Sequence, residues 1–264
     1  MSLELKILAA ILLAVAAAPG DLRAPALKAN QSYAFNDTVS SKSSTAVTGT
    51  GLSYKLPDPS YVESTQKILR TISVIAFDDH GLPSQFRISY GENQAPESAV
   101  TVAGREFDVR VTPGAVDVTS KDARDLSSGD RSYVVNEATK FIDYLAASEE
   151  FTTLTLSTTD YQDISSQLIS KLLGLPQDQV QKASIKREQN ADSRTFDIRL
   201  VLVGGQNQHA GDVEMSGTMQ IKDDWSSFDT LLQNKTTRSA TYENTQIKID
   251  TTWSIALSRQ LDKQ

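Results

Sequence analysis

The clearest pattern along the chain is an alternation of apolar and polar positions near its C-terminal end. Within residues 247–257, Ile247, Ile249, Trp253, Ile255 and Leu257 share one parity, and polar or small residues fill the other. This period places the two kinds of side chain on opposite faces of a β-strand. A strand this long exceeds the usual five or six residues, so it needs long partners. One apolar and one polar face indicate an antiparallel sheet.

Shorter alternations predict hairpins elsewhere in the chain. Residues 71–77 and 86–90 flank the turn Asp78-Asp79-His80-Gly81, and residues 107–111 and 116–118 flank Pro113-Gly114. Because Pro-Gly favours a turn that matches strand twist poorly, we expect that connection to be looser than two residues. Further strands are expected at 52–56, 183–187, 196–203, 213–222 and 228–237, with a turn at 190–192. Gly217 interrupts one of them and indicates a bend or bulge.

The apolar period changes to that of a helix in the middle of the chain. A first helix is expected near 128–147, where Val134, Ala138, Phe141, Ile142 and Leu145 form one stripe after a capping serine, Ser127 or Ser128. A second helix is expected near 159–174. Its features are a cap at Thr159, a stripe of Ile164, Leu168 and Leu172, and a stop at Gly174 and Pro176.

These elements predict an α+β fold. We expect a long, curved, half-barrel-like antiparallel sheet built of successive hairpins, with two helices packed on its apolar face, as one domain over residues 52–264. Periplasmic carriers of lipids and lipoproteins have a similar layout, a likeness of architecture alone. The β blocks 62–119 and 180–259 share too little sequence to count as a repeat, so an internal duplication stays open.

The N-terminal segment has the features of an export signal. Residues 1–26 combine Lys6, an apolar run at 7–18 and small-residue cleavage candidates, which is typical of a secretory signal peptide; an uncleaved anchor or a buried helix are the alternatives. We therefore expect a secreted or periplasmic protein. Residues 27–51 are rich in Ser and Thr and are interpreted as a flexible linker.

Composition excludes several functions. The net charge of −7 and the absence of a basic block disfavour binding to nucleic acids. The chain has no Cys, so disulfides, thiolate nucleophiles, Cys-ligated zinc and a lipoprotein anchor are excluded. No later segment has the length and hydropathy of a transmembrane span.

Candidate chemistry is sparse. The two histidines, His80 and His209, have no metal-ligand spacing, and Gly204-Gly205 lacks the context of a phosphate-binding loop. The adjacent acids Asp223-Asp224 and Glu149-Glu150 point apart on a strand or helix. We therefore expect no catalytic residue, metal ligand or cofactor, and the sequence does not identify ligand-binding residues. Trp225, Trp253, Met215 and Met219 are interpreted as core.

Three functional hypotheses remain. The first is an exported, non-catalytic protein that binds an apolar or amphipathic, lipid-like ligand between sheet and helices. The second is a structural or protein-interaction module of the cell envelope without a ligand cavity. The third is an enzyme in which acids, or His80 and His209, converge in one cleft. A continuous apolar cavity of several hundred Å³ would favour the first hypothesis, and a filled core the second.

Overall fold

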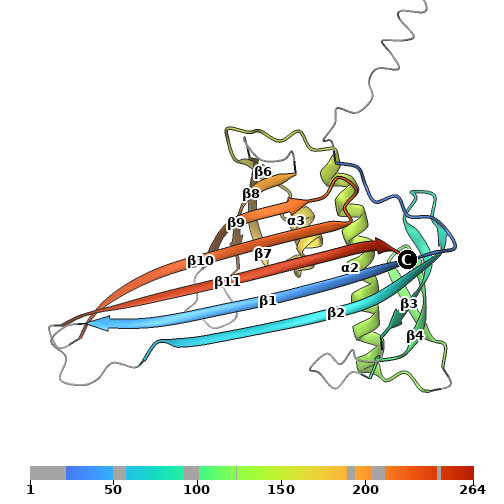
Figure 1. Ribbon diagram of the computed structural model, residues 1–264, viewed down its shortest axis with the longest axis horizontal. Helices are drawn as coiled ribbons and strands as arrows, with labels where there is room; N and C mark the ends of the chain where they lie inside the picture. Colours follow the sequence, from blue (N-terminus) through green and yellow to red (C-terminus); the bar gives the residue numbers. More distant parts are fainter. Residues whose placement is uncertain are drawn as a thin grey trace, which may run out of the picture.

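The computed structural model describes residues 22–49, 58–91, 101–122, 124–188, 194–203, 212–242 and 245–264. Within them, eleven strands form one antiparallel sheet in the order β5-β4-β3-β2-β1-β11-β10-β9-β8-β7-β6 (Figure 1). Strands that follow one another in the chain are neighbours in the sheet, except β5 and β6, which form its two edges. The sheet therefore consists of two runs of hairpins joined where the first strand, β1, meets the last, β11. This arrangement confirms the expected α+β fold with a curved antiparallel sheet.

The strands fall into a long central group and shorter flanking groups. The elements are β1 (Gln31–Gly49), β2 (Ser60–Phe77), β3 (Pro83–Tyr90), β4 (Glu106–Thr112), β5 (Ala115–Ser120), α2 (Ser128–Thr152), β6 (Gln162–Ile164), α3 (Ser166–Leu173), β7 (Val180–Arg187), β8 (Thr195–Leu202), β9 (Val213–Ile221), β10 (Ser227–Tyr242) and β11 (Thr245–Lys263). The long C-terminal strand predicted from the sequence is β11, and its register with β1 runs from Tyr33–Lys263 to Gly49–Ile247.

The interpretation of residues 27–51 as a flexible linker is wrong for β1. This strand lies between β2 and β11 at the centre of the sheet. Tyr33 and Phe35 are buried on its helix-facing side. Ser and Thr fill the rest of the strand without preventing it, because backbone pairing on both sides satisfies its polar groups and Thr is β-branched. The Ser- and Thr-rich composition therefore led to the wrong interpretation, whereas the alternation at Tyr33 and Phe35 could have indicated a strand.

The first helix agrees with its prediction, whereas the second is shorter. α2 begins where the Ser127 hydroxyl accepts a hydrogen bond from the Asp130 N–H (3.0 Å), and it continues to Thr152. α3 is capped by Ser165, not by Thr159, and residues 162–164 form the edge strand β6. Ser165 caps because its hydroxyl accepts the N–H of Leu168 (3.3 Å). Gly174 ends α3 in the left-handed conformation (φ 67°), as expected.

Both predicted hairpin turns form. The Asp78 carboxylate accepts the N–H groups of His80 and Leu82, each at 2.9 Å. Pro113 and Gly114 alone connect β4 to β5, because Thr112 pairs directly with Ala115. This connection is tighter than expected, and Gly114 makes it possible with φ 86°. The strand expected at 52–56 and the turn expected at 190–192 lie outside the described residues.

Gly217 marks a close approach of two strands rather than a bulge. It pairs with Ile198 of β8 and Leu232 of β10, and the register is continuous past it on both sides. A Cβ atom at this position would overlap the backbone carbonyl of Leu231. Since the obstacle is backbone, it cannot move without displacing β10.

Replacing Gly217 by Ala should therefore destabilise the protein by about 1–3 kcal/mol, the usual cost of overpacking, or more. Urea unfolding followed by circular dichroism measures the change. The control is Ser216→Ala at the neighbouring exposed position, which should stay within about 0.5 kcal/mol of the parent. Equal stabilities of Gly217→Ala and the control would contradict the close approach.

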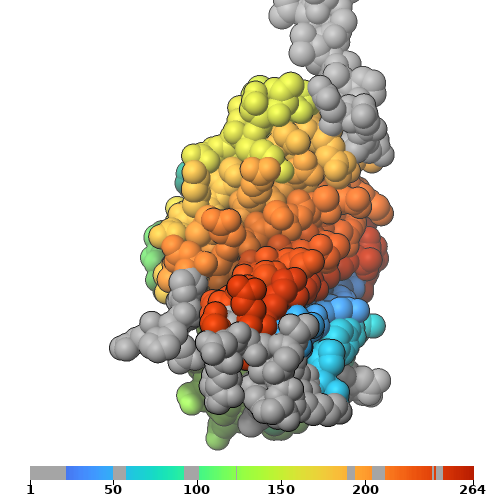
Figure 2. Space-filling model, turned by 90° about the vertical axis from the view of Figure 1, so that its left-hand side faces the viewer, coloured from blue at the N-terminus to red at the C-terminus, as the bar shows by residue number. Residues whose placement is uncertain are grey.

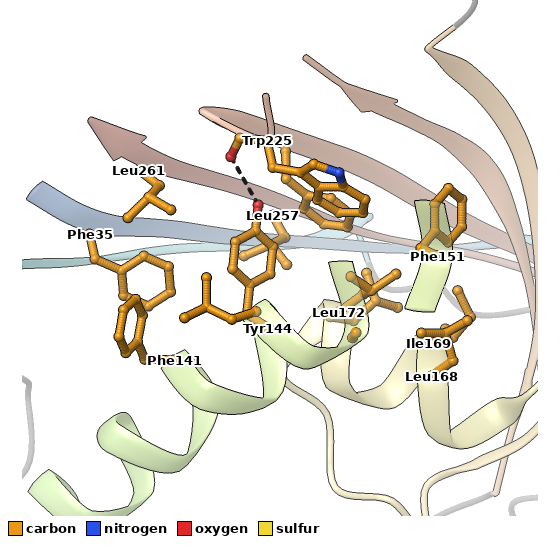
Figure 3. Packing of buried hydrophobic residues seen from close by; sticks show 14 of the residues in the cluster. Phe35, Phe141, Tyr144, Phe151, Leu168, Ile169, Leu172, Trp225, Leu257 and Leu261 are labelled. Carbon is orange, nitrogen blue, oxygen red and sulfur yellow. Dashed lines mark hydrogen bonds between the residues drawn. The ribbon is translucent and has the colours of Figure 1, made fainter. Parts of the chain in front are cut away.

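Aromatic side chains fill the space between sheet and helices (Figure 3). Phe141 of α2 lies between Phe35 and Phe86, with ring centroids 5.0 and 5.4 Å away. Tyr144 of α2 donates its hydroxyl to the carbonyl of Trp225 (3.2 Å). Phe151, at the end of the same helix, contacts Phe196 and Trp225 at 5.3 and 5.7 Å. The described residues thus form a packed core along α2, in the place where a lipid-like ligand was expected.

The central strands continue beyond the helices as a four-stranded extension (Figure 1). We call this extension the arm and define it as residues 39–49 of β1, 60–69 of β2, 234–242 of β10 and 245–255 of β11. In the ribbon it projects to the left, away from α2 and α3, and Figure 2 shows the molecule from that end. Of the described elements, neither helix reaches along it, and most of its described side chains are exposed or partly buried.

Candidate functional site

The residues singled out from the sequence do not converge in the described structure. His80 is exposed in the turn between β2 and β3. His209 and Gly204-Gly205 lie outside the described residues, so the meeting of the two histidines stays untested. Among the residues that the structure does describe, no group of three or more His, Asp or Glu side chains is arranged to hold a metal ion.

The adjacent acids have structural partners. Asp223 forms an ion pair with Arg194, and Asp224 accepts the N–H of Ser226 (3.0 Å) in the turn before β10. The latter contact contributes to a pKa of Asp224 below its usual range, although partial burial alone would raise that pKa. Glu149 and Glu150 are exposed near the end of α2. These pairs lie apart, in a turn and on a helix end.

Of the tryptophans and methionines expected in the core, three are buried and one is only partly so. Trp225, Met215 and Met219 are fully buried. Trp253 packs against the core cluster but is only partly buried, because it lies in the arm on the helix-facing side of β11. It is therefore the one tryptophan of the two that remains accessible to a partner.

A cluster of charged side chains is buried where the sheet meets both helices. Asp37 of β1 binds Arg259 of β11 (2.6 Å) and Arg70 of β2 (2.7 Å). Arg70 also binds Glu137 of α2 (2.8 Å). All four side chains are at most 5% exposed. The cluster thus joins the three central strands to α2.

The same cluster reaches α3 and the aromatic core. Arg259 donates from Nη1 to the carbonyl of Leu172 (2.9 Å) in the last turn of α3, where a helix end attracts positive charge. Its guanidinium lies 4.6 Å from the ring of Tyr144, and that of Arg70 lies 4.4 Å from the ring of Phe35. Lys140 closes the cluster by binding Glu137 (2.9 Å) one helical turn away.

Electrostatics keep Asp37 ionised. Burial alone would raise the pKa of this carboxyl, but Arg259 and Arg70 lower it to about 2 from its ordinary value of 3.8. For Arg70, burial alone would lower the pKa, but Asp37 and Glu137 raise it. Asp37 and Arg70 are therefore held as ions by their partners. The cluster joins strands and helices, and Asp37 in it is not poised to exchange a proton near neutral pH.

Since the pKa of Asp37 is lower in the folded than in the unfolded chain, its ionised form stabilises the fold. The contribution, about 2 kcal/mol, is complete above pH 4–5 and is lost as the pH falls toward 2.

Asp37→Asn should cost about 3 kcal/mol at pH 7, because it leaves two buried guanidinium groups short of negative charge. Its stability should also fall less than that of the parent between pH 5 and pH 2. The measurement is urea unfolding across that range. The control is Asp108→Asn, which removes a half-exposed cross-strand partner of Arg87 and should cost under about 1 kcal/mol. If the free energy of unfolding fell equally for Asp37→Asn and the parent between pH 5 and pH 2, the lowered pKa assigned to Asp37 would be contradicted.

Sequence reasoning missed this cluster although a signal was present. Arg259 has the parity of Leu257 and Leu261, and Arg70 has the parity of Ile68 and Ile72. A charge on the apolar face of a strand must be paired or exposed. The partners could not be inferred, because Asp37 fell in the supposed linker.

A wide hollow lies outside the core, at a fork between β9 and β10. These strands pair from Phe228–Ile221 to Gln233–Ser216 and then separate. Beyond that point the side-chain amide of Asn234 donates to the carbonyl of Glu214 (2.5 Å). The strands β9, β8 and β7 lie on one side of the fork. On its other side, β10 continues into the arm.

We call the hollow at this fork the fork groove; its volume is about 1230 Å³ and it is open to solvent. Its charged lining comprises the cations Lys182, Arg199, Lys235 and Arg238 and the acids Asp212 and Glu214. Trp253 and Val213 add apolar surface, and several Ser and Thr residues complete the lining. A mixed, open groove of this kind suits a polar or amphipathic partner better than a lipid chain, which a closed apolar cavity holds.

Comparison with known proteins adds no family to this picture: no family model and no curated protein matches the chain. Within the part of the chain that the structure describes, neither α2 nor α3 combines the length and hydropathy needed to cross a membrane.

Proposed function

We propose that this chain is an exported, non-catalytic binding module that recognises a protein partner through the fork groove and the adjacent arm. The observation that carries the proposal is the position of the open space. The interface between sheet and helices, where a carrier would hold its cargo, is packed with aromatic rings, whereas the fork groove, about 1230 Å³ in volume, lies outside it.

The chemistry of the groove supports a polypeptide partner. Lys235 and Arg238 project from β10 into a site that also contains Glu214, so both signs of charge are available for salt bridges. Partly buried Trp253 lies on the adjacent strand, opposite Asn234. Accessible aromatic and Arg side chains are the residue types that contribute most to binding at protein interfaces.

A second candidate is a carrier of an amphipathic small molecule that uses the same groove. Trp253 and Val213 favour it, because they give the groove an apolar portion beside its charges. In that case the charged head of the ligand would face the cations and its apolar part would face Trp253. The binding site would then lie at the fork and not beneath the helices.

Native mass spectrometry of gently purified protein separates the two candidates. The binding-module proposal expects the mass of the chain alone, or of whole-number assemblies of chains. A smaller adduct that solvent extraction removes, and that resolves into a lipid or another small molecule, would contradict the proposal and support the carrier.

Site-specific photo-crosslinking tests the location of the partner. A photoreactive residue at Thr236, in the groove, should form one discrete adduct with a protein when the chain is expressed in its native cell. The control is Thr119, which is also exposed but lies on β5, the edge strand on the other side of the sheet. We expect the adduct at Thr119 to be much weaker, because this position lies far from the groove. Equal adducts at both positions would overturn the assignment of the groove.

A further inference from the structure

Three of the four cations that line the fork groove have no acidic partner. Arg199 of β8 and Lys235 and Arg238 of β10 are exposed, and none of them forms an ion pair with a residue that the structure describes. The fourth cation, Lys182, pairs with Asp163 (3.5 Å). The lining includes only two acids against these four cations. The groove is therefore a positive region on a chain whose net charge is −7, and it attracts negative charge.

Arg199 lies among uncharged neighbours across the sheet. The register places it opposite Ser184 of β7 on one side and Ser216 of β9 on the other. Asp197, two positions earlier on the same face of β8, is bound by Lys186 (3.1 Å). Among the described residues, the positive charge of Arg199 is thus left without a counterion.

The ring of Tyr161 positions the guanidinium of Arg199. The centre of this group lies 3.7 Å from the ring centroid of Tyr161. A guanidinium that lies over an aromatic ring keeps its N–H donors, which point outward in its own plane. In the described part of the chain these donors form no hydrogen bond. Arg199 is therefore held in place in advance, with donors that can bind both oxygens of a carboxylate.

Both walls of the groove are cationic, whereas its acids lie between them. β8 supplies Arg199 on one side, and β10 supplies Lys235 and Arg238 on the other, beyond the point where it separates from β9. The acids Asp212 and Glu214 both lie at the beginning of β9, the strand between β8 and β10. A bound segment consequently meets cations on each side of the groove.

We infer that the fork groove binds an acidic segment of the partner protein and that Arg199 holds a carboxylate of this segment. The inference rests on the proposed function, because it names the chemistry of the partner in the same groove. Partly buried Trp253 supplies a contact for an apolar side chain beside the charges. The segment that matches the lining contains at least two Asp or Glu residues and one apolar residue.

A nucleic acid matches the groove less well than an acidic polypeptide. Its charge is continuous, with a phosphate at every nucleotide. Asp212 and Glu214 within the groove, and the net charge of −7 on the whole chain, would repel such a polymer. The separate carboxylates of a polypeptide can bind Arg199 and Lys235 without lying against these acids.

Neutralising Arg199 tests the inference through the crosslink at Thr236. With expression limiting, Arg199→Gln should reduce the adduct about tenfold, because a charged, two-point contact is lost. The matched control is Arg110→Gln. Arg110 is also an exposed strand arginine without an ion pair to a described residue, but it lies on β4, on the other side of the sheet. This control should change the adduct by no more than about twofold.

Tyr161 offers a second pair of variants. Tyr161→Phe keeps an aromatic ring beside Arg199 and should retain most of the adduct. Tyr161→Leu removes the ring and should reduce the adduct about threefold, which corresponds to the usual strength of an exposed cation–π contact. Circular dichroism of each purified variant establishes that it is folded. Equal adducts for the two Tyr161 variants would contradict the positioning of Arg199 by this ring.

Peptide mass spectrometry of the adduct identifies the partner segment itself. We expect at least two Asp or Glu residues within about six residues of the crosslinked position, roughly 20 Å of extended chain. Three results overturn the inference while the partner site in the groove stands: a neutral or basic segment, an undiminished adduct in Arg199→Gln, or an equal loss in Arg110→Gln. The absence of any adduct at Thr236 in the parent would instead overturn the proposed function, and this inference with it.

Discussion

The buried ion cluster around Asp37 is the interaction on which the architecture depends. It is the point where the first, second and last strands are bound to one another and to both helices. A buried charge is costly unless it is paired, so each member requires the others. Asp37 and Arg259 are 222 positions apart in the chain, and their contact fixes the β1–β11 junction that turns two sets of hairpins into a single sheet.

The cluster also marks the boundary between two regions of different character. On one side of it, Phe35, Phe141 and Tyr144 form a closed core against α2. On the other side, Val39 is already 36% exposed and the strands continue as the arm. The packed core and the proposed binding site are thereby separated in space: the helices cover one part of the sheet, and the fork groove and the arm lie beyond them.

Much of the fold was predictable from local pattern, because alternation and helical stripes reflect which face of each element is buried. The hairpins around His80 and Pro113, the helix α2 and the strand β11 follow in this way. The predictions failed for features that depend on contacts with residues distant in sequence. β1 is rich in Ser and Thr and is a strand because β2 and β11 flank it, and Asp37 is buried because Arg70 and Arg259 neutralise it. The fork groove likewise arises where β9 and β10 separate. The alternation of apolar and polar residues within one strand does not indicate where that strand separates from its neighbour.

The division between a filled core and an accessible arm is tested most directly by hydrogen–deuterium exchange of the purified protein. The account predicts that α2 and the residues of β1, β2 and β11 on the core side of Asp37 exchange slowest and together, since their opening requires the ion cluster to break. About half of the amides in residues 60–68 should exchange much faster, because that stretch pairs with β1 on one side and with no described strand on the other. Protection of residues 60–68 equal to that of 70–77, or an α2 that exchanges faster than the arm, would contradict it.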